Sequence, residues 1–223
     1  MSKSPADKLR VSETIAVSTL WEVPRGATAC YVLAHGAGAG MAHPFMESVA
    51  KALAARNIAT LRFQFPYMER GSKRPDPPKL CHATVRAAVE LARKETGLPL
   101  IAGGRSFGGR MASQAQAAEP LPSVVGLAFL GFPLHPPKAP ADERAEHLQD
   151  TTIPVLFLQG TRDELADLPL ITALAKRLGK RATLQLFEDA DHSFHVRARS
   201  GRTDAQVFEQ MMSDLAGWVN NIS

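Results

Sequence analysis

The sequence contains little of what marks several protein classes. Its 223 residues include only two cysteines, Cys30 and Cys81, which are too few for a disulfide framework. Aromatic residues make up 6% of the chain, and the formal net charge is only +4. A nucleic-acid binder concentrates positive charge on one face and adds aromatic platforms for the bases. We therefore predict two buried, reduced thiols, a surface of solvated charges and no nucleic-acid partner.

Long apolar runs are missing as well. The longest, from Val124 to Phe132, has about half the length that a membrane-spanning helix requires. The first residues, MSKSPADKLR, carry charges but no apolar stretch behind them, unlike a secretory signal. These features predict no membrane partner and a location in the reducing cytoplasm.

The apolar residues that are present, 45% of the chain, form short runs that alternate with helical patterns. A β-rich segment from Leu9 to Val23 precedes six runs of strand length: Ala27–Ala34, Ile58–Phe65, Leu98–Gly103, Val124–Phe132, Ile153–Gly160 and Ala182–Phe187. Between them apolar residues recur at helical spacing, and Thr203 stands at capping-box distance from Gln206 before the last helix. This alternation predicts an α/β fold in one domain, residues 1–223, with helices on both faces of a mostly parallel sheet. The short Pro-rich segment 133–152 is the only candidate lid.

Residues 104–108, Gly-Arg-Ser-Phe-Gly, match the pattern G-x-S-x-G. The pattern follows the predicted strand Leu98–Gly103 and precedes a helical stretch from Met111 to Ala118. At a sharp strand-to-helix turn the serine hydroxyl is raised above the sheet edge, and the flanking glycines let strand and helix nearly touch. A tightly packed Gly-rich loop would show the same pattern, but this context favours Ser106 as a nucleophile.

A serine hydroxyl needs a base to take its proton, and the base needs an acid to orient it. In sheets that carry this turn, the acid and then the histidine follow the serine, each beyond a strand. Asp163 comes directly after the run Ile153–Gly160, and His192 comes soon after Ala182–Phe187. We therefore predict a triad of Ser106, Asp163 and His192. Nearby alternatives or supporting groups are Glu164, Asp167, Asp189, Asp191 and His195.

The oxyanion of such a reaction is held by two backbone N–H groups. One belongs to the residue after the nucleophile, here Phe107, and the other to the loop after an earlier strand. That loop is His-Gly-Ala-Gly-Ala-Gly at residues 35–40, in which Ala37 is the first candidate and Gly38 the second. The loop lacks the spacing and the lysine of a phosphate-binding loop, so a phosphate-binding role is not expected. The triad mechanism itself needs no metal or organic cofactor, and none is predicted.

Four segments together carry a family resemblance: LAHGAGAGM, GGRSFGGRM, QGTRDEL and DADHSF. They resemble the small, lid-poor α/β-hydrolases of the dienelactone-hydrolase-like branch, above all bacterial relatives of a mammalian testis-expressed hydrolase-like protein. The similarity extends from about Thr28 to Trp218. It implies an α/β-hydrolase fold with little or no lid. Dienelactone hydrolases proper use a cysteine and haloalkane dehalogenases an aspartate where this chain has Ser106, so neither substrate class is implied.

These observations predict a serine hydrolase of small carboxylic esters or thioesters that works through an acyl-enzyme. A peptidase or acyltransferase would use the same triad, and the sequence does not separate these activities. The resemblance also implies an alternative, a non-catalytic protein-interaction module, because some eukaryotic relatives are subunits of chromatin complexes. The oligomeric state is not indicated.

A further hypothesis concerns the charge of the substrate. Two segments expected on the active-site side of the sheet carry seven basic residues: Arg70, Lys73, Arg74, Lys79, Arg197, Arg199 and Arg202. A cationic rim of this kind raises the local concentration of anionic substrates. The alternative is that these are solvated charges on loops that point away from the cleft.

Overall fold

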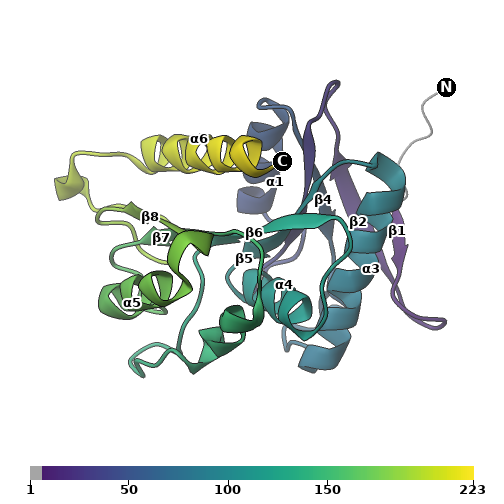
Figure 1. Ribbon diagram of the computed structural model, residues 1–223, viewed down its shortest axis with the longest axis horizontal. Coiled ribbons are helices and arrows are strands. Elements are labelled where there is room, and N and C mark those ends of the chain that lie inside the picture. The colour runs from purple at the N-terminus through teal and green to yellow at the C-terminus, as the bar shows by residue number, and fades with distance from the viewer. Residues whose placement is uncertain (1–6) are drawn as a thin grey trace.

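The apolar runs form a single eight-stranded sheet in the computed structural model, which describes residues 7–223. Part of the segment MSKSPADKLR therefore lies outside the described residues. The strands have the order β1-β2-β4-β3-β5-β6-β7-β8 (Figure 1). They are β1 (Lys8–Arg10), β2 (Ala16–Glu22), β3 (Ala29–Ala34), β4 (Ile58–Phe63), β5 (Leu100–Arg105), β6 (Val124–Leu130), β7 (Val155–Gly160) and β8 (Ala182–Phe187).

The six strands from β3 to β8 run parallel, and only the N-terminal pair is antiparallel to its neighbours. Every residue of β3, β4 and β7 is buried, as expected for parallel strands covered on both faces. The β-rich start divides into β1 and β2 because a tight turn between Val11 and Ile15 reverses the chain. The predicted α/β-hydrolase fold with a mostly parallel sheet is thus confirmed.

The longer helices divide between the two faces of the sheet (Figure 1). One face carries α1 (Pro44–Ala54) and α6 (Asp204–Ile222), and the other carries α3 (Pro78–Thr96), α4 (Phe107–Ala118) and α5 (Leu168–Leu178). Four short helical turns complete the described chain: α2 (Pro66–Glu69), η1 (Glu143–Asp150), η2 (Gly179–Arg181) and η3 (Ala198–Ser200). The last helix begins with the predicted capping box between Thr203 and Gln206.

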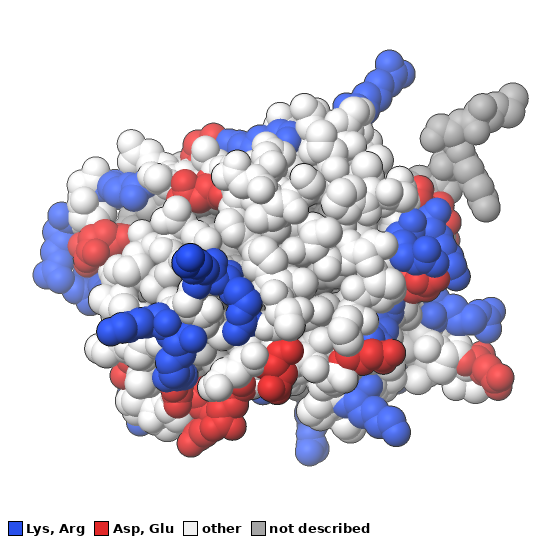
Figure 2. All heavy atoms as spheres, in the orientation of Figure 1, with Lys and Arg blue, Asp and Glu red and all other residues white. Residues whose placement is uncertain are grey.

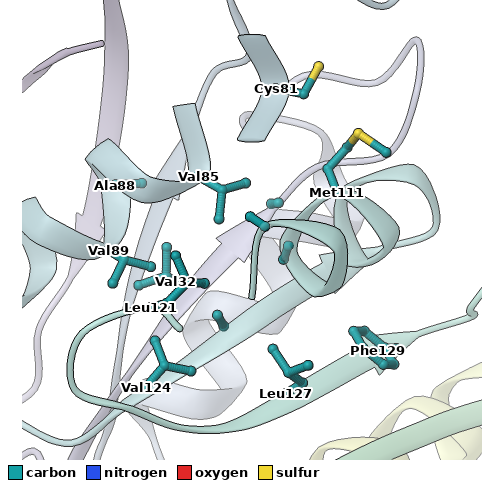
Figure 3. Close-up of a cluster of buried hydrophobic side chains, with 14 of the residues drawn as sticks. Val32, Cys81, Val85, Ala88, Val89, Met111, Leu121, Val124, Leu127 and Phe129 are labelled. Atoms are coloured by element: carbon teal, nitrogen blue, oxygen red, sulfur yellow. The ribbon is translucent and has the colours of Figure 1, made fainter. Parts of the chain in front are cut away.

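The sheet separates two apolar clusters, one under each helical layer. Figure 3 shows part of the larger one, where Val85 and Val89 of α3 and Met111 of α4 lie over the sheet. Both cysteines belong to this cluster, and their thiols are free and buried, as predicted. Burial raises the pKa of each thiol to about 12, so both are protonated at neutral pH.

Two surface features bear on the predicted partners. Of the helices in residues 7–223, none is both long and apolar enough to span a membrane. On the face shown in Figure 2, Lys and Arg side chains stand singly or in small groups near Asp and Glu. On this face the Lys and Arg side chains are therefore spread out rather than gathered in one patch.

Candidate active site

Ser106 occupies a strained turn between β5 and α4. Its φ of 48° and ψ of −116° lie in a region that residues with a side chain rarely adopt. A Cβ atom on Gly104 would stand 2.0 Å from the carbonyl oxygen of Ala34, and one on Gly108 would stand 2.5 Å from that of His35. Only glycine fits at these two positions, so the chain can pass close to β3 and expose the serine.

Three side chains from distant parts of the chain form a continuous hydrogen-bonded series. The Nε2 atom of His192 lies 3.0 Å from Oγ of Ser106, and its Nδ1 atom lies 2.7 Å from Oδ2 of Asp163. Asp163 follows β7 and its side chain is fully buried, whereas His192 lies beyond β8 with 22% of its side chain exposed. A carboxylate only accepts hydrogen bonds, so Nδ1 carries the proton and Nε2 faces the serine hydroxyl as an acceptor.

Gln159 holds the carboxylate of Asp163 in place. Its side-chain amide donates to Oδ2 of Asp163, and its carbonyl oxygen accepts from the backbone N–H of Phe132 at 2.9 Å. The second carboxylate oxygen accepts from the backbone N–H of Leu165 at 2.8 Å. Sequence reasoning missed Gln159, although a lone polar residue in the otherwise apolar run of β7 was a usable signal.

Two of the alternative acids, Asp167 and Asp191, and the second histidine, His195, have different partners. Asp167 stands at the start of α5 with 45% of its side chain exposed, and its carboxylate lies 3.5 Å from Nε2 of His135. Asp191 accepts the backbone N–H groups of Ser193 and His195, which shapes the loop that carries His192. His195 pairs with Asp204 at 2.6 Å, and this hydrogen bond raises its pKa.

The two predicted oxyanion donors belong to segments that adjoin Ser106: Phe107 follows it directly, and a Cβ atom on Gly36, the residue before Ala37, would stand 3.9 Å from Cβ of Ser106. Phe107 is the first residue of α4, where backbone N–H groups have no partner within the helix. Ala37 lines the cavity into which Ser106 opens. The loop of Ala37 is held at its base by His35, a buried residue whose Nε2 accepts from the backbone N–H of Phe65 at 3.0 Å. Burial lowers the pKa of His35 to about 4, so the ring is neutral and its Nδ1 donates to the carbonyl of Gly36.

The cavity beside Ser106 has a volume of about 670 Å³ and is lined partly by apolar side chains, those of Phe45, Met46 and Leu165 among them. This volume suits a small molecule. No residue of the candidate lid, 133–152, lines it. Instead η1, which belongs to that segment, packs against α4, where His147 and Ser113 form a 2.7 Å hydrogen bond. The expectation of little or no lid is confirmed.

The seven basic residues of the two predicted loops are not among those that line the cavity. Arg70 instead pairs with Asp76 at 2.5 Å, and Arg202 contacts Gln206 and Gln210 of α6. The permanent cation in the cavity wall is Arg105, which the sequence reasoning treated only as part of the nucleophile pattern. In the part of the chain that the structure describes, no group of three or more His, Cys, Asp or Glu side chains is placed to hold a metal ion.

A protein-family comparison agrees with this fold. Residues 27–220 match the model of an α/β-hydrolase domain, and the chain therefore belongs to that family. Membership supports hydrolase chemistry.

Solved structures with the same fold include three bacterial proteins. An α/β serine hydrolase without a lid from Xanthomonas campestris has 20% identity and a TM-score of 0.74, over 95% of this chain and 93% of that one. A dienelactone hydrolase from Anabaena variabilis has 21% identity and a TM-score of 0.75, over 96% and 95%. An α/β serine hydrolase homologue from Coxiella burnetii has 19% identity and a TM-score of 0.76, over 96% and 99%. At these identities the likeness shows the fold alone.

Proposed function

We propose that this protein is a serine hydrolase that cleaves small carboxylic esters or thioesters. The observation that carries the proposal is the series Asp163–His192–Ser106, which ends at a hydroxyl on the wall of the cavity. A non-catalytic interaction module has no use for a strained serine whose hydroxyl faces a basic nitrogen at 3.0 Å.

The reaction proceeds in two halves. Ser106 Oγ attacks the acyl carbon while His192 Nε2 takes the hydroxyl proton, and the resulting oxyanion accepts hydrogen bonds from the N–H groups of Phe107 and Ala37. His192 then passes the proton to the leaving alcohol or thiol, and an acyl-enzyme remains on Ser106. A water molecule, deprotonated by His192, attacks the acyl-enzyme, and His192 returns that proton to Ser106 Oγ as the bond to the acyl group breaks and the acid is released. Asp163 keeps the imidazole in the required tautomer throughout.

The absence of a covering segment from the described cavity wall favours small, water-soluble substrates over lipid droplets. A peptidase or an acyltransferase would use the same residues with another leaving group or acceptor. The relation to the testis-expressed hydrolase-like proteins, the cytoplasmic location and the single domain over residues 1–223 stay predictions.

Labelling with a fluorophosphonate probe, followed by a panel of p-nitrophenyl esters and thioesters of increasing acyl length, tests the proposal. We expect wild type to be labelled and Ser106→Ala to be neither labelled nor active. Ser113→Ala is a matched control, because Ser113 also hydrogen-bonds a histidine but is fully buried within α4. An unlabelled wild-type protein, or a Ser106→Ala variant with activity within tenfold of wild type, would refute the proposal.

A further inference from the structure

Arg105 is the residue before the proposed nucleophile, and its side chain forms part of the cavity wall. The guanidinium carbon lies 4.7 Å from the ring centre of Phe45 and 5.6 Å from that of Phe194. Burial lowers the pKa of the guanidinium, an effect that Asp163 and Asp191 oppose. Even so, arginine stays charged in proteins. The fold therefore keeps a permanent positive charge, supported by two aromatic rings, in the wall of the cavity that Ser106 also lines.

This charge is without a direct counter-ion. Among residues 7–223, no carboxylate lies within ion-pair distance of Arg105. Its Nη2 atom donates to Ser193 Oγ at 3.3 Å, which is long compared with the 2.7–2.9 Å of charge-assisted hydrogen bonds. Its Nη1 atom is buried and makes no hydrogen bond. A half-buried cation with a buried donor that makes no hydrogen bond is costly to the folded state, and a ligand that accepts from the guanidinium would offset this cost.

The nearest carboxylates already have other partners. Asp163 accepts hydrogen bonds from His192, Gln159 and the backbone N–H of Leu165. Asp191 accepts two backbone N–H groups of its own loop.

The described residues that line the cavity include no Asp or Glu, but they include His43 and His195 as well as Arg105. His195 pairs with Asp204 at 2.6 Å, and the carboxylate that raises the pKa of His195 also compensates its charge, so Arg105 is the cation of the wall that has no counter-ion among the described residues. The charge of Arg105 thus faces a partly apolar cavity, and no Asp or Glu side chain is among the described residues that line it. Such a cavity favours an anionic ligand.

We propose that Arg105 binds a carboxylate carried by the substrate, so that the enzyme prefers esters or thioesters with a negative charge near the scissile bond. This inference rests on the proposed function. The carboxylate replaces the hydroxyl of Ser193 at Nη2, and the planar guanidinium can then turn to present a second nitrogen to it. The basic loops predicted from the sequence are not needed for this preference, because the cation lies in the wall itself.

Two pairs of substrates test the proposal from both sides of the ester bond. Phenyl hydrogen terephthalate and its carboxamide differ in charge on the acyl side. The corresponding pair on the leaving-group side is 4-acetoxybenzoate and 4-acetoxybenzamide. For wild type we expect kcat/KM to be about 10- to 100-fold higher for the acid of at least one pair, the effect of a hydrogen bond to a charged group. Arg105→Gln should bring that ratio close to one, while Arg105→Lys should keep part of it.

Arg197→Gln is the matched control, since Arg197 is exposed on the loop beyond His192 and does not line the cavity. Arg197→Gln should leave the ratio unchanged. The preference should also persist in 0.5 M salt, because a contact inside the wall is screened much less than surface charge. Equal efficiency of acid and amide in both pairs for wild type would overturn the proposal. So would an Arg105→Gln variant that loses activity equally on acid and amide, since that result identifies a purely structural role.

A binding measurement separates this proposal from the hydrolase proposal. Calorimetric titration of Ser106→Ala with phenyl hydrogen terephthalate should show binding, and the double variant Ser106→Ala/Arg105→Gln should bind it at least tenfold more weakly. If the wild type hydrolyses none of the esters but this difference is found, the hydrolase proposal fails and the anion site stands. If esters are cleaved but both variants bind the probe equally, the anion site fails.

Discussion

Replacing Asp163 by asparagine is a sharp test of the proposed mechanism, because it changes one atom without changing the size of the side chain. In the native protein Oδ2 faces two donors, Nδ1 of His192 at 2.7 Å and the amide of Gln159, while Oδ1 faces the N–H of Leu165. An asparagine has only one oxygen. With its oxygen on the backbone N–H of Leu165, which cannot reorient, its NH₂ group takes the Oδ2 position, opposes Gln159 and forces Nδ1 of His192 to become an acceptor.

The resulting tautomer places the imidazole proton on Nε2, 3.0 Å from Ser106 Oγ, where it cannot accept the serine proton. We expect kcat to fall by about 10⁴, which corresponds to about 5.4 kcal/mol of transition-state stabilisation. The opposed donors leave one buried group unsatisfied, at a cost of about 1–3 kcal/mol in the free energy of unfolding. A chain of this size should then melt several degrees lower, roughly 2–4 °C per kcal/mol.

Steady-state hydrolysis of the best ester from the acyl-length panel measures the first effect, and thermal unfolding followed by circular dichroism measures the second. The isosteric control is Asp167→Asn, because Asp167 is the nearest rival acid and its side chain is 45% exposed. That variant should remain within a few-fold of wild type. A mild effect of Asp163→Asn combined with a severe effect of Asp167→Asn would refute the assignment of the acid.

Three further predictions concern stability and packing. Burial, with Arg110 and His82, lowers the pKa of His147 from 6.5 to about 4, so the unfolded chain binds this proton first as the pH falls. The free energy of unfolding should therefore fall as the pH is lowered from 6.5 to 4. Urea unfolding at several pH values measures this dependence, and His147→Gln should reduce it by at most about 1.4 kcal/mol per pH unit. The same pH dependence in His147→Gln and wild type would contradict this prediction. Gly104→Ala should be unfolded or nearly so in thermal melts, because its Cβ would stand 2.0 Å from the carbonyl oxygen of Ala34. The control is Gly217→Ala in α6, where a Cβ meets nothing within 4 Å, and it should be neutral or stabilise the fold by up to about 1 kcal/mol. Ellman's reagent should detect no thiol in the folded protein and two after denaturation, and a rapid reaction before denaturation would show that Cys30 or Cys81 is accessible.

Much of the fold follows from local patterns in the sequence. All six predicted runs form strands, and their ends differ from the prediction by no more than two residues. The reason is that a parallel strand buried on both faces requires a continuous apolar run, which few other elements share. The turn at Ser106 is equally local, since its glycines are needed wherever strand and helix approach within contact distance.

The order of Ser106, Asp163 and His192 along the chain is likewise a property of the sequence, because each follows a strand and the ends of parallel strands meet at one edge. The contact between their side chains is not a property of the sequence alone. Ser106 and His192 are 86 positions apart, and only the packing of β5 to β8 brings Oγ within 3.0 Å of Nε2.

The partners of the supporting residues were decided by the tertiary structure. Gln159 and His35 act through partners up to 30 positions away, and nothing in their neighbouring residues indicates which of these atoms they will meet. The sequence by itself determined the elements, their order and the residue types able to do chemistry, because these depend on local backbone preferences and apolar periodicity. Which cation faces the cavity was decided only by packing. Phe45 and Phe194 hold Arg105 in the cavity wall, while the seven basic residues of the two loops lie outside it. The physical reason is that the type of a residue fixes its charge, whereas the packing of distant segments fixes the direction of its side chain.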